Sequence, residues 1–244
     1  MAGRSLDPLS AEIKGLAGRS TADLIGIAPG EAFSEEELGE LGRAFGPVRS
    51  VVVLAQHIVD PVQTVRFQSG RSAEESAVAA SFGDALLRDA CWRVVEALRE
   101  AGWQAAILRN MCYGFPDPRH GVSYKKAAVL AGLGAFGRNQ LLIHPEWGPW
   151  LYLRAVVTDA LLPTDSRSSF SPCADCGRCI EACPAGALSE QGFNRSACEL
   201  FYKSVGAGQL HLSPHGRVNC EECMRACPVG TAPPRLAIGQ GNHG

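Results

Sequence analysis

The chain has 244 residues, of which 46% are hydrophobic, so it can bury a real core and has room for one medium-sized domain and a small one. A formal charge of −2 at pH 7 gives no global attraction to nucleic acid, and no apolar run reaches the roughly 18 residues that a membrane span needs. The first residues, MAGRSLDPLSAEIK, lack the apolar core of a secretory signal, so we expect a cytoplasmic protein in a reducing compartment.

The first third of the sequence alternates between strand and helix patterns. Residues 23–27 form a short apolar run closed by a Pro-Gly pair, which predicts a strand and a turn. Ser34 and Glu37 have the spacing of a capping box for a helix that we expect to reach Phe45. Residues 50–55 are rich in β-branched side chains and predict a buried strand.

The clearest helix is predicted over residues 77–101, because apolar side chains recur there on one helical stripe, and Gly102 is its expected C-terminal stop. The stripe consists of Leu86, Leu87, Cys91, Val94, Val95 and Leu98. Cys91 lies on this stripe and is therefore interpreted as a small core residue. Another strand is predicted over 103–108.

Turn-forming and polar residues mark a loop over 110–121, and a helix over 124–133 leads into a glycine-rich bend, Gly132-Leu-Gly-Ala-Phe-Gly-Arg-Asn139. Residues 140–144 and 150–158 then look like a strand pair, whose hairpin Trp147 and Trp150 would pack. Residues 162–172 read as a linker, and the tail after Pro228 has little to bury.

Eight of the ten cysteines lie in the last third, in two runs. The first run has the C-x₂-C-x₂-C-x₃-C-P spacing of two-cluster ferredoxins, in which the fourth cysteine ligates the other [4Fe–4S] cluster. The second run is spread out, with one cysteine standing alone before the other three. Crossing the fourth ligands assigns Cys173, Cys176, Cys179 and Cys227 to one cluster, and Cys183, Cys198, Cys220 and Cys223 to the other.

Two other interpretations of these cysteines fit less well. Structural zinc does not need a three-thiolate run with a distal fourth ligand and a proline in both halves. Disulfides would need an oxidising compartment. The sequence therefore predicts two [4Fe–4S] clusters and electron transfer, in a small ferredoxin-like unit whose folding depends on its inorganic cores.

Three features together resemble the epoxyqueuosine reductase family, which is related to corrinoid-dependent reductive dehalogenases. They are the segment from Lys126 to Asn139, the expected strand pair that ends in Ala-Val-Val-Thr-Asp159, and the crossed cysteine pattern. The resemblance spans residues 84–228 and implies an α+β chain, with a nitroreductase-like, cobalamin-binding N-terminal domain before the ferredoxin module. We accordingly expect domains over 1–165 and 166–230, followed by a tail over 231–244.

The sequence differs from the family pattern at two places. Longer members carry a C-terminal helical-repeat domain that helps to hold transfer RNA, whereas this chain ends shortly after Cys227, so transfer RNA is a doubtful partner. The queuosine enzymes place an acidic proton donor in a stretch that begins Asp-Ser-Ala-Pro. Here that region reads Asp117-Pro-Arg-His-Gly-Val-Ser123, and Asp117 corresponds only by approximate position.

Candidate residues for the chemistry lie in the polar loop and in the bend that follows it. Asp117 and His120 are candidate proton donors, and the alternative is an Asp-Pro turn beside a solvated histidine. Cys112 could be a redox-active thiol or a buried loop cysteine. The bend could bind a corrinoid side chain or a flavin phosphate, or it could bind no ligand. Its candidate contact residues are Gly132, Gly134, Gly137, Arg138 and Asn139.

These observations leave three hypotheses. The first is an iron–sulfur oxidoreductase that passes electrons through two clusters to a cobalamin with its lower base displaced. The sequence lacks an Asp-x-His-x-x-Gly motif, so no protein histidine would lie beneath the cobalt. The second is an electron carrier that docks a partner enzyme, and the third is a flavin-dependent reductase. Each would need an electron donor of the ferredoxin or flavodoxin type, and the substrate stays open.

Overall fold

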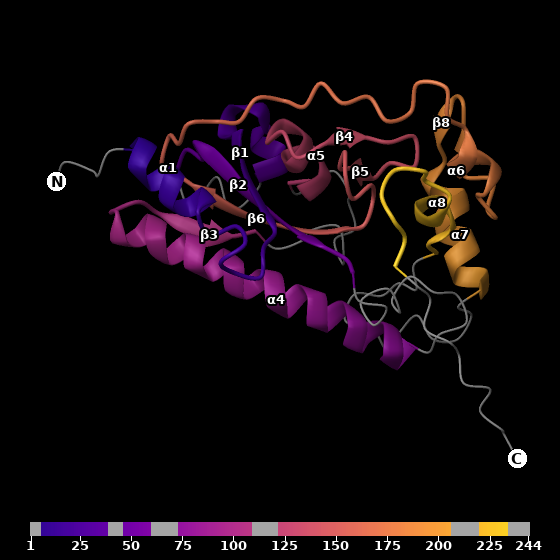
Figure 1. Ribbon diagram of the computed structural model, residues 1–244, viewed down its shortest axis with the longest axis horizontal. Helices are drawn as coiled ribbons and strands as arrows, with labels where there is room; N and C mark the ends of the chain where they lie inside the picture. Colours follow the sequence, from indigo (N-terminus) through magenta and orange to yellow (C-terminus); the bar gives the residue numbers. More distant parts are fainter. Residues whose placement is uncertain (1–5, 39–45, 60–72, 109–121, 206–219, 234–244) are drawn as a thin grey trace, which may run out of the picture.

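The computed structural model describes residues 6–38, 46–59, 73–108, 122–205 and 220–233. A four-stranded antiparallel sheet with strand order β1-β2-β6-β3 forms its centre (Figure 1). The strands of this sheet are β1 (Leu24–Pro29), β2 (Ser50–His57), β3 (Ala105–Ile107) and β6 (Leu151–Thr158). The helices around it are α1 (Leu6–Lys14), η1 (Gly30–Ala32), α4 (Ala73–Glu100) and α5 (Tyr124–Leu130).

Both faces of the sheet are buried, because apolar residues occupy both alternating sets along β2. Val52 and Leu54 face a core that they share with α1 and α4, whereas Val51 and Val53 face a second core under α5. The expected helical stripe of α4 lies in the first core from Leu87 onward, whereas Leu86 is half-buried outside it, and Cys91 is fully buried. The sheet with α1, α4 and α5 is called the sheet body below.

Local sequence signals account for the ends of these elements. Ser34 and Glu37 form the expected capping box: the backbone N–H of Ser34 donates to Glu37 Oε2 at 2.9 Å, and that of Glu37 donates to Ser34 Oγ at 3.2 Å. At the end of α4, Gly102 has φ of +90°, and the next residue, Trp103, donates its N–H to the carbonyl of Leu98. This hydrogen bond is that of a Schellman cap, which favours glycine at the left-handed position.

The expected hairpin between residues 140–144 and 150–158 is wrong. β5 (Leu142–Ile143) pairs instead with β4 (Ala135–Phe136), and β6 pairs with β2 and β3. The intervening Pro145–Pro149 segment therefore carries the chain from one sheet to another. Trp150 packs no hairpin, since it is fully buried in the core between the sheet and α4.

The segment expected to be a linker is attached to the sheet body. The backbone N–H of Asp165 donates to Ile27 O at 2.9 Å, and its carboxylate accepts from Ile27 N at 2.8 Å and from Lys14 Nζ. Figure 1 shows this segment running back across the molecule to the small elements at the far end of the sheet body. These elements are α6 (Arg178–Glu181), β7 (Leu188–Ser189), β8 (Gly192–Phe193), α7 (Arg195–Val205) and α8 (Glu222–Arg225).

Residues 229–233 are also better packed than the composition of the segment suggests. Ala232 lies against the core of the sheet body, and the carbonyl of Pro233 accepts a hydrogen bond from Arg225 at 2.9 Å. The expectation that the tail has little to bury is therefore wrong for residues 229–233. Within the described ranges, no helix is both long and apolar enough to cross a membrane.

Candidate iron–sulfur centre

The two cysteine runs form the same local structure. In each, one turn of helix (α6 or α8) follows a loop cysteine, and the final cysteine donates its N–H to the carbonyl three residues before it. These closing hydrogen bonds, Cys183 to Ile180 and Cys227 to Met224, measure 3.2 and 3.1 Å. The two helical turns contact each other. The region is therefore an internal repeat, which brings the fourth cysteine of each run towards the other run.

The eight thiols form two groups, and within each group the charge of one thiolate raises the pKa of its neighbours. Burial raises the pKa of Cys179, and the charges of Cys173, Cys176 and Cys227 raise it further. The pKa of Cys227 is likewise raised by burial and by Cys173 and Cys176. These four thiols are neighbours, although one of them follows the others by more than forty positions in the sequence.

The second group consists of the remaining four cysteines. Burial raises the pKa of Cys220, and Cys183 and Cys198 raise it further. Cys223 is the most strongly shifted thiol of the set, with burial and the other three thiols of its group raising its pKa to about 12. Its pKa also responds to Cys179, so the two groups adjoin.

Backbone N–H groups donate to sulfur in both groups. In the first group, Arg138 N lies 3.5 Å from Cys173 Sγ, and the N–H of Val229 donates to Cys227. In the second, Ala187 N lies 3.3 Å from Cys183 Sγ, and the N–H of Glu222 donates to Cys220. Such donors stabilise the thiolate form, which is the form that binds iron.

The described residues contain no group of three or more His, Cys, Asp or Glu side chains placed to hold a single metal ion. A tetrahedral zinc site would need its sulfurs about 3.8 Å apart, given Zn–S bonds of about 2.3 Å. A cubane presents four separate irons, so its thiolates do not have to converge on one point. Four neighbouring cysteines with backbone donors to sulfur fit such a cluster in each group.

The bend that carries the predicted cofactor residues joins the sheet body to both cysteine groups. Arg138 Nη1 donates to the carbonyl of Cys176 at 2.9 Å and pairs with Glu190 at 3.1 Å. The next residue, Asn139, is buried and donates from Nδ2 to the carbonyl of Cys223 at 3.3 Å. Two successive side chains thus contact the first group and the second.

The glycines of this bend approach the chain's own backbone. A Cβ at Gly134 would lie 2.3 Å from the carbonyl oxygen of Ile143, and one at Gly132 would lie 2.3 Å from that of Ser166. At Gly137 the nearest atom is Asn139 Oδ1, at 2.6 Å. The chain itself therefore requires small residues here, and a larger side chain at Gly134 would separate β4 from β5.

A second pair of glycines brings the segment after Cys227 against the sheet body. Gly148 and Gly230 both have positive φ, and a Cβ on Gly148 would lie 1.8 Å from the carbonyl oxygen of Val229. A Cβ on Gly230 would meet the backbone of Trp147 at 2.3 Å. This contact fixes the chain two residues beyond the last cysteine of the first group.

The same loop contains an aromatic stack that the sequence analysis missed. Trp147 stacks with His57 and with His144, with ring centroids 4.8 Å and 4.6 Å apart. Burial lowers the pKa of both histidines, and the shift is opposed by the charges of Asp23 and Glu146 at His57 and by that of Glu146 at His144. The residues come from β2 and from the loop before β6, so no local pattern could have predicted the stack.

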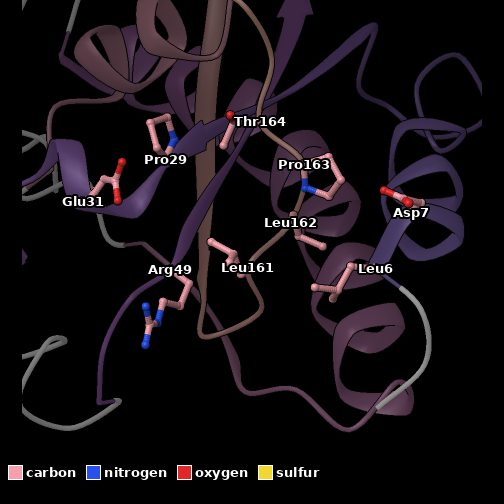
Figure 2. A pocket seen from close by; sticks show the side chains of 9 residues that line it. All are labelled: Leu6, Asp7, Pro29, Glu31, Arg49, Leu161, Leu162, Pro163 and Thr164. Atoms are coloured by element: carbon pink, nitrogen blue, oxygen red, sulfur yellow. The ribbon is translucent and has the colours of Figure 1, made fainter. Parts of the chain in front are cut away.

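Three of the sequence candidates, Asp117, His120 and Cys112, lie outside the described residues, and their roles stay predictions. A cavity of about 420 Å³ opens between α1, the end of β1 and the segment after β6 (Figure 2). It is lined partly by Asp7, Glu31 and Arg49 and by Leu161–Thr164. It lies at the opposite end of the sheet body from α6–α8 and contains none of the candidate residues (Figure 1).

The geometry and the comparisons with known proteins agree on the class of protein. Residues 172–231 match the model of the 4Fe-4S dicluster domain, so the chain is an iron–sulfur protein with a two-cluster module following an α+β body. We call residues 172–231 the cluster region. The resemblance to the epoxyqueuosine reductases is confirmed by sequence: the chain is 40% identical over 107 residues to the enzyme of Synechococcus sp. and 34% identical over 113 residues to that of Listeria monocytogenes.

These alignments cover 43% and 41% of this chain, and 33% and 28% of the two relatives. The chain thus matches about a third of the length of its curated relatives. The fold is similar over a longer range. The epoxyqueuosine reductase of Bacillus subtilis superposes on 92% of the chain with a TM-score of 0.64 and 19% identity, and the chain covers 66% of that structure.

A catabolic reductive dehalogenase solved with 3-bromo-4-hydroxybenzoic acid has a TM-score of 0.66 and 21% identity, over 92% of this chain and 32% of its own. The expected α+β fold, with a nitroreductase-like body and a ferredoxin-like module, is therefore confirmed.

Proposed function

We propose that the chain is an iron–sulfur reductase in which two [4Fe–4S] clusters deliver single electrons to a corrinoid carried by the sheet body. The presence of two clusters is supported by the crossed grouping of the thiols, in which Cys227 lies beside the first run and Cys183 beside the second. The ligands of one cluster are then Cys173, Cys176, Cys179 and Cys227, and those of the other are Cys183, Cys198, Cys220 and Cys223.

Each cluster, when bound, takes up and releases one electron at a time. The protein supplies the thiolates and the N–H donors that stabilise them. Arg138 and Asn139 hold the loops of both groups against the sheet body, and Gly148 fixes the segment after Cys227. A fixed distance between the clusters and the sheet body is what stepwise electron transfer requires.

The corrinoid half rests on the likeness to the epoxyqueuosine reductases and to a reductive dehalogenase solved in connection with B12-dependent dehalogenation. None of the compared proteins favours the flavin alternative. The glycines of the bend already approach the chain's own backbone. We therefore propose that the corrinoid contacts the exposed side chain of this segment, which is that of Phe136. Phe136 in β4 is 46% exposed and lies two residues from Arg138.

Anaerobic titration of cobalamin into the cluster-loaded chain tests this proposal. We expect a shift of the corrinoid absorption spectrum on binding, weakened in Phe136→Glu and unchanged in Leu161→Glu. Leu161 is a matched control, since it is equally apolar, 61% exposed and located beside the distant cavity. A wild-type chain that holds both clusters but gives no corrinoid shift would contradict the corrinoid half and favour an electron carrier.

The substrate and partners are part of the same proposal. One solved epoxyqueuosine reductase holds a modified tRNA stem loop, and this chain covers 65% of that structure. Binding of such a stem loop to the cluster-loaded chain, measured against an unmodified stem loop, would extend the proposal to RNA. We expect the electrons to come from a protein of the ferredoxin or flavodoxin class.

A further inference from the structure

The turn of helix in the second cysteine run carries a buried ion pair. Glu221 directly precedes α8 and its side chain is 1% exposed, while Arg225 is the last residue of α8 and its side chain is 18% exposed. Arg225 Nε lies 2.7 Å from Glu221 Oε1. A charge buried this deeply is costly unless an opposite charge accompanies it, so each of the two side chains stabilises the other at this position.

The guanidinium of Arg225 also contacts two other segments. Its Nη1 donates to the carbonyl of Pro233 at 2.9 Å, and its Cζ lies 5.3 Å from the centre of the Trp150 ring. Trp150 is 1% exposed in the core between the sheet and α4, and Met224 of α8 packs in the same core. A planar guanidinium can donate from its edge and stack with its face at the same time. Arg225 therefore joins α8, the segment after the last cysteine and the sheet body.

The first cysteine run lacks this ion pair, although its local structure is the same. The turn of helix α6 follows Gly177 and ends at Glu181, which are the positions that Glu221 and Arg225 occupy around α8. Gly177 has no side chain to form a pair, and Glu181 is exposed. A cysteine run can thus form its helical turn without a buried ion pair. The pair in the second run is explained instead by what Arg225 contacts outside the turn.

The sheet body contacts the second run on both sides of Cys227. Arg225, two residues before this cysteine, lies over Trp150, and Val229, two residues after it, lies against Gly148. Cys227 is the cysteine that the second run supplies to the first group. The spacing of the first run does not place this distant thiolate, so the fold has to bring it to the other three ligands.

We propose that Arg225 is the positioning residue for Cys227, and that it acts by fixing the end of α8 against Trp150 and Pro233. The inference rests on the proposed pair of clusters. Arg225 itself binds no iron. It holds in place the thiolate for one of the four irons of the first cluster, so that iron should be weakly held in a chain without the Arg225 contacts.

Iron analysis and paramagnetic resonance test the inference on the full chain, reconstituted anaerobically with iron and sulfide and then treated with limiting ferricyanide. Ferricyanide takes one electron from a [4Fe–4S]²⁺ cluster, and the [4Fe–4S]³⁺ product releases a weakly held iron as Fe²⁺ and leaves paramagnetic [3Fe–4S]⁺. The wild type should keep about eight irons, and Arg225→Met should keep about seven. The [3Fe–4S] signal of this variant should match that of Cys227→Ala, which lacks the same thiolate, and differ from that of Cys183→Ala.

Glu181→Gln is the matched control, because Glu181 has the equivalent position in the first run, two residues before Cys183. It should keep the wild-type iron content. Arg225→Met leaves the carboxylate of Glu221 buried without this cation and therefore also lowers the stability of the chain. The double variant Glu221→Gln/Arg225→Met removes both charges and should regain most of that stability in chemical denaturation. It still lacks the contact with Pro233, so it should still lose one iron.

Wild-type iron content in Arg225→Met overturns the inference. Wild-type iron content in the double variant also overturns it, because the buried carboxylate of Glu221 would then be the cause of the loss in the single variant. In both cases the proposed clusters stand. If Arg225→Met does not fold, the double variant decides. A wild type that holds no clusters overturns the inference and the proposed function together.

Discussion

The sheet body and the cluster region obtain their stability in different ways. The sheet body buries two apolar cores, one on each face of an antiparallel sheet, and its longest helix has 28 residues. The described part of the cluster region contains two helices of four residues and α7 of eleven, and few of its apolar side chains are buried. Helices this short are not stable alone. The comparison indicates that one region folds on hydrophobic burial and the other on its bound clusters.

The largest expected effect comes from the two cysteines that cross between the runs. Cys183→Ala should remove or alter the cluster otherwise held by Cys198, Cys220 and Cys223, because it deletes the fourth thiolate of that group. Cys227→Ala should affect the other cluster. Paramagnetic resonance of the two reduced variants distinguishes the signals, and loss of the same signal in both would refute the crossed assignment.

The contact between the regions is tested at Gly148. Gly148→Ala places a methyl group against the carbonyl of Val229 and should displace the segment after Cys227. Gly18→Ala is the matched control, since Gly18 also has positive φ but nothing lies within 4 Å of its Cβ position. The control should lower the free energy of unfolding by about 1 kcal/mol, from the backbone conformation alone.

Gly148→Ala should cost more than the control and should also change the signal of the first cluster. Denaturation under anaerobic conditions, followed by circular dichroism, measures the first effect and paramagnetic resonance the second. Equal losses in the two variants, with unchanged cluster signals, would mean that this contact does not hold the cluster region.

Cys91 allows the sheet body to be weakened without touching the clusters. Its thiol is fully buried, and burial raises its pKa to about 12, so it has no reactive thiolate near neutral pH. Cys91→Ser puts a hydroxyl into the apolar core and should lower the free energy of unfolding by about 1–3 kcal/mol. The iron content should stay at the wild-type value. A loss of iron would show that the cluster region depends on the apolar core of the sheet body for its stability.

The smallest expected effect is a pH dependence at the aromatic stack. The pKa values of His57 and His144 are lowered in the folded chain, so the unfolded chain binds protons first as the pH falls. Stability should therefore decrease below about pH 6.5, the ordinary histidine value. His57→Phe keeps a ring over Trp147 and removes one titrating group.

The melting temperature of His57→Phe should fall less than that of the wild type between about pH 7.5 and about pH 5.5. An identical decrease in the two proteins would exclude His57 as the source.

Local signals predicted much of this structure, whereas contacts between distant segments were not predictable. The capping box at Ser34, the cap at Gly102 and the strand β2 each depend on a few adjacent residues. The cysteine spacing predicts a crossed assignment of ligands, because iron–sulfur ligation constrains sequence directly, and this assignment stays a prediction. By contrast, the pairing of β6 with β2 depends on register between segments about a hundred residues apart, which hydrophobic pattern alone does not specify.

The glycine-rich bend shows that a local sequence pattern can predict a close approach without identifying the segment that is approached. Its glycines predicted a close approach of the backbone, and the structure has one, to Ile143 and Ser166. Sequence alone could not indicate that Arg138 and Asn139 contact the cysteine loops, because those loops follow some 35 to 84 positions later. Only the folded arrangement identifies Arg138 as a neighbour of the first cysteine group.

The most direct test of the central claim is the metal content of the chain after anaerobic reconstitution with iron and sulfide. The account predicts about eight irons and about eight sulfides per chain, four of each in each of two cubane clusters. A content near one zinc with no sulfide would contradict it, as would about four irons, which would leave one group of cysteines without a cluster.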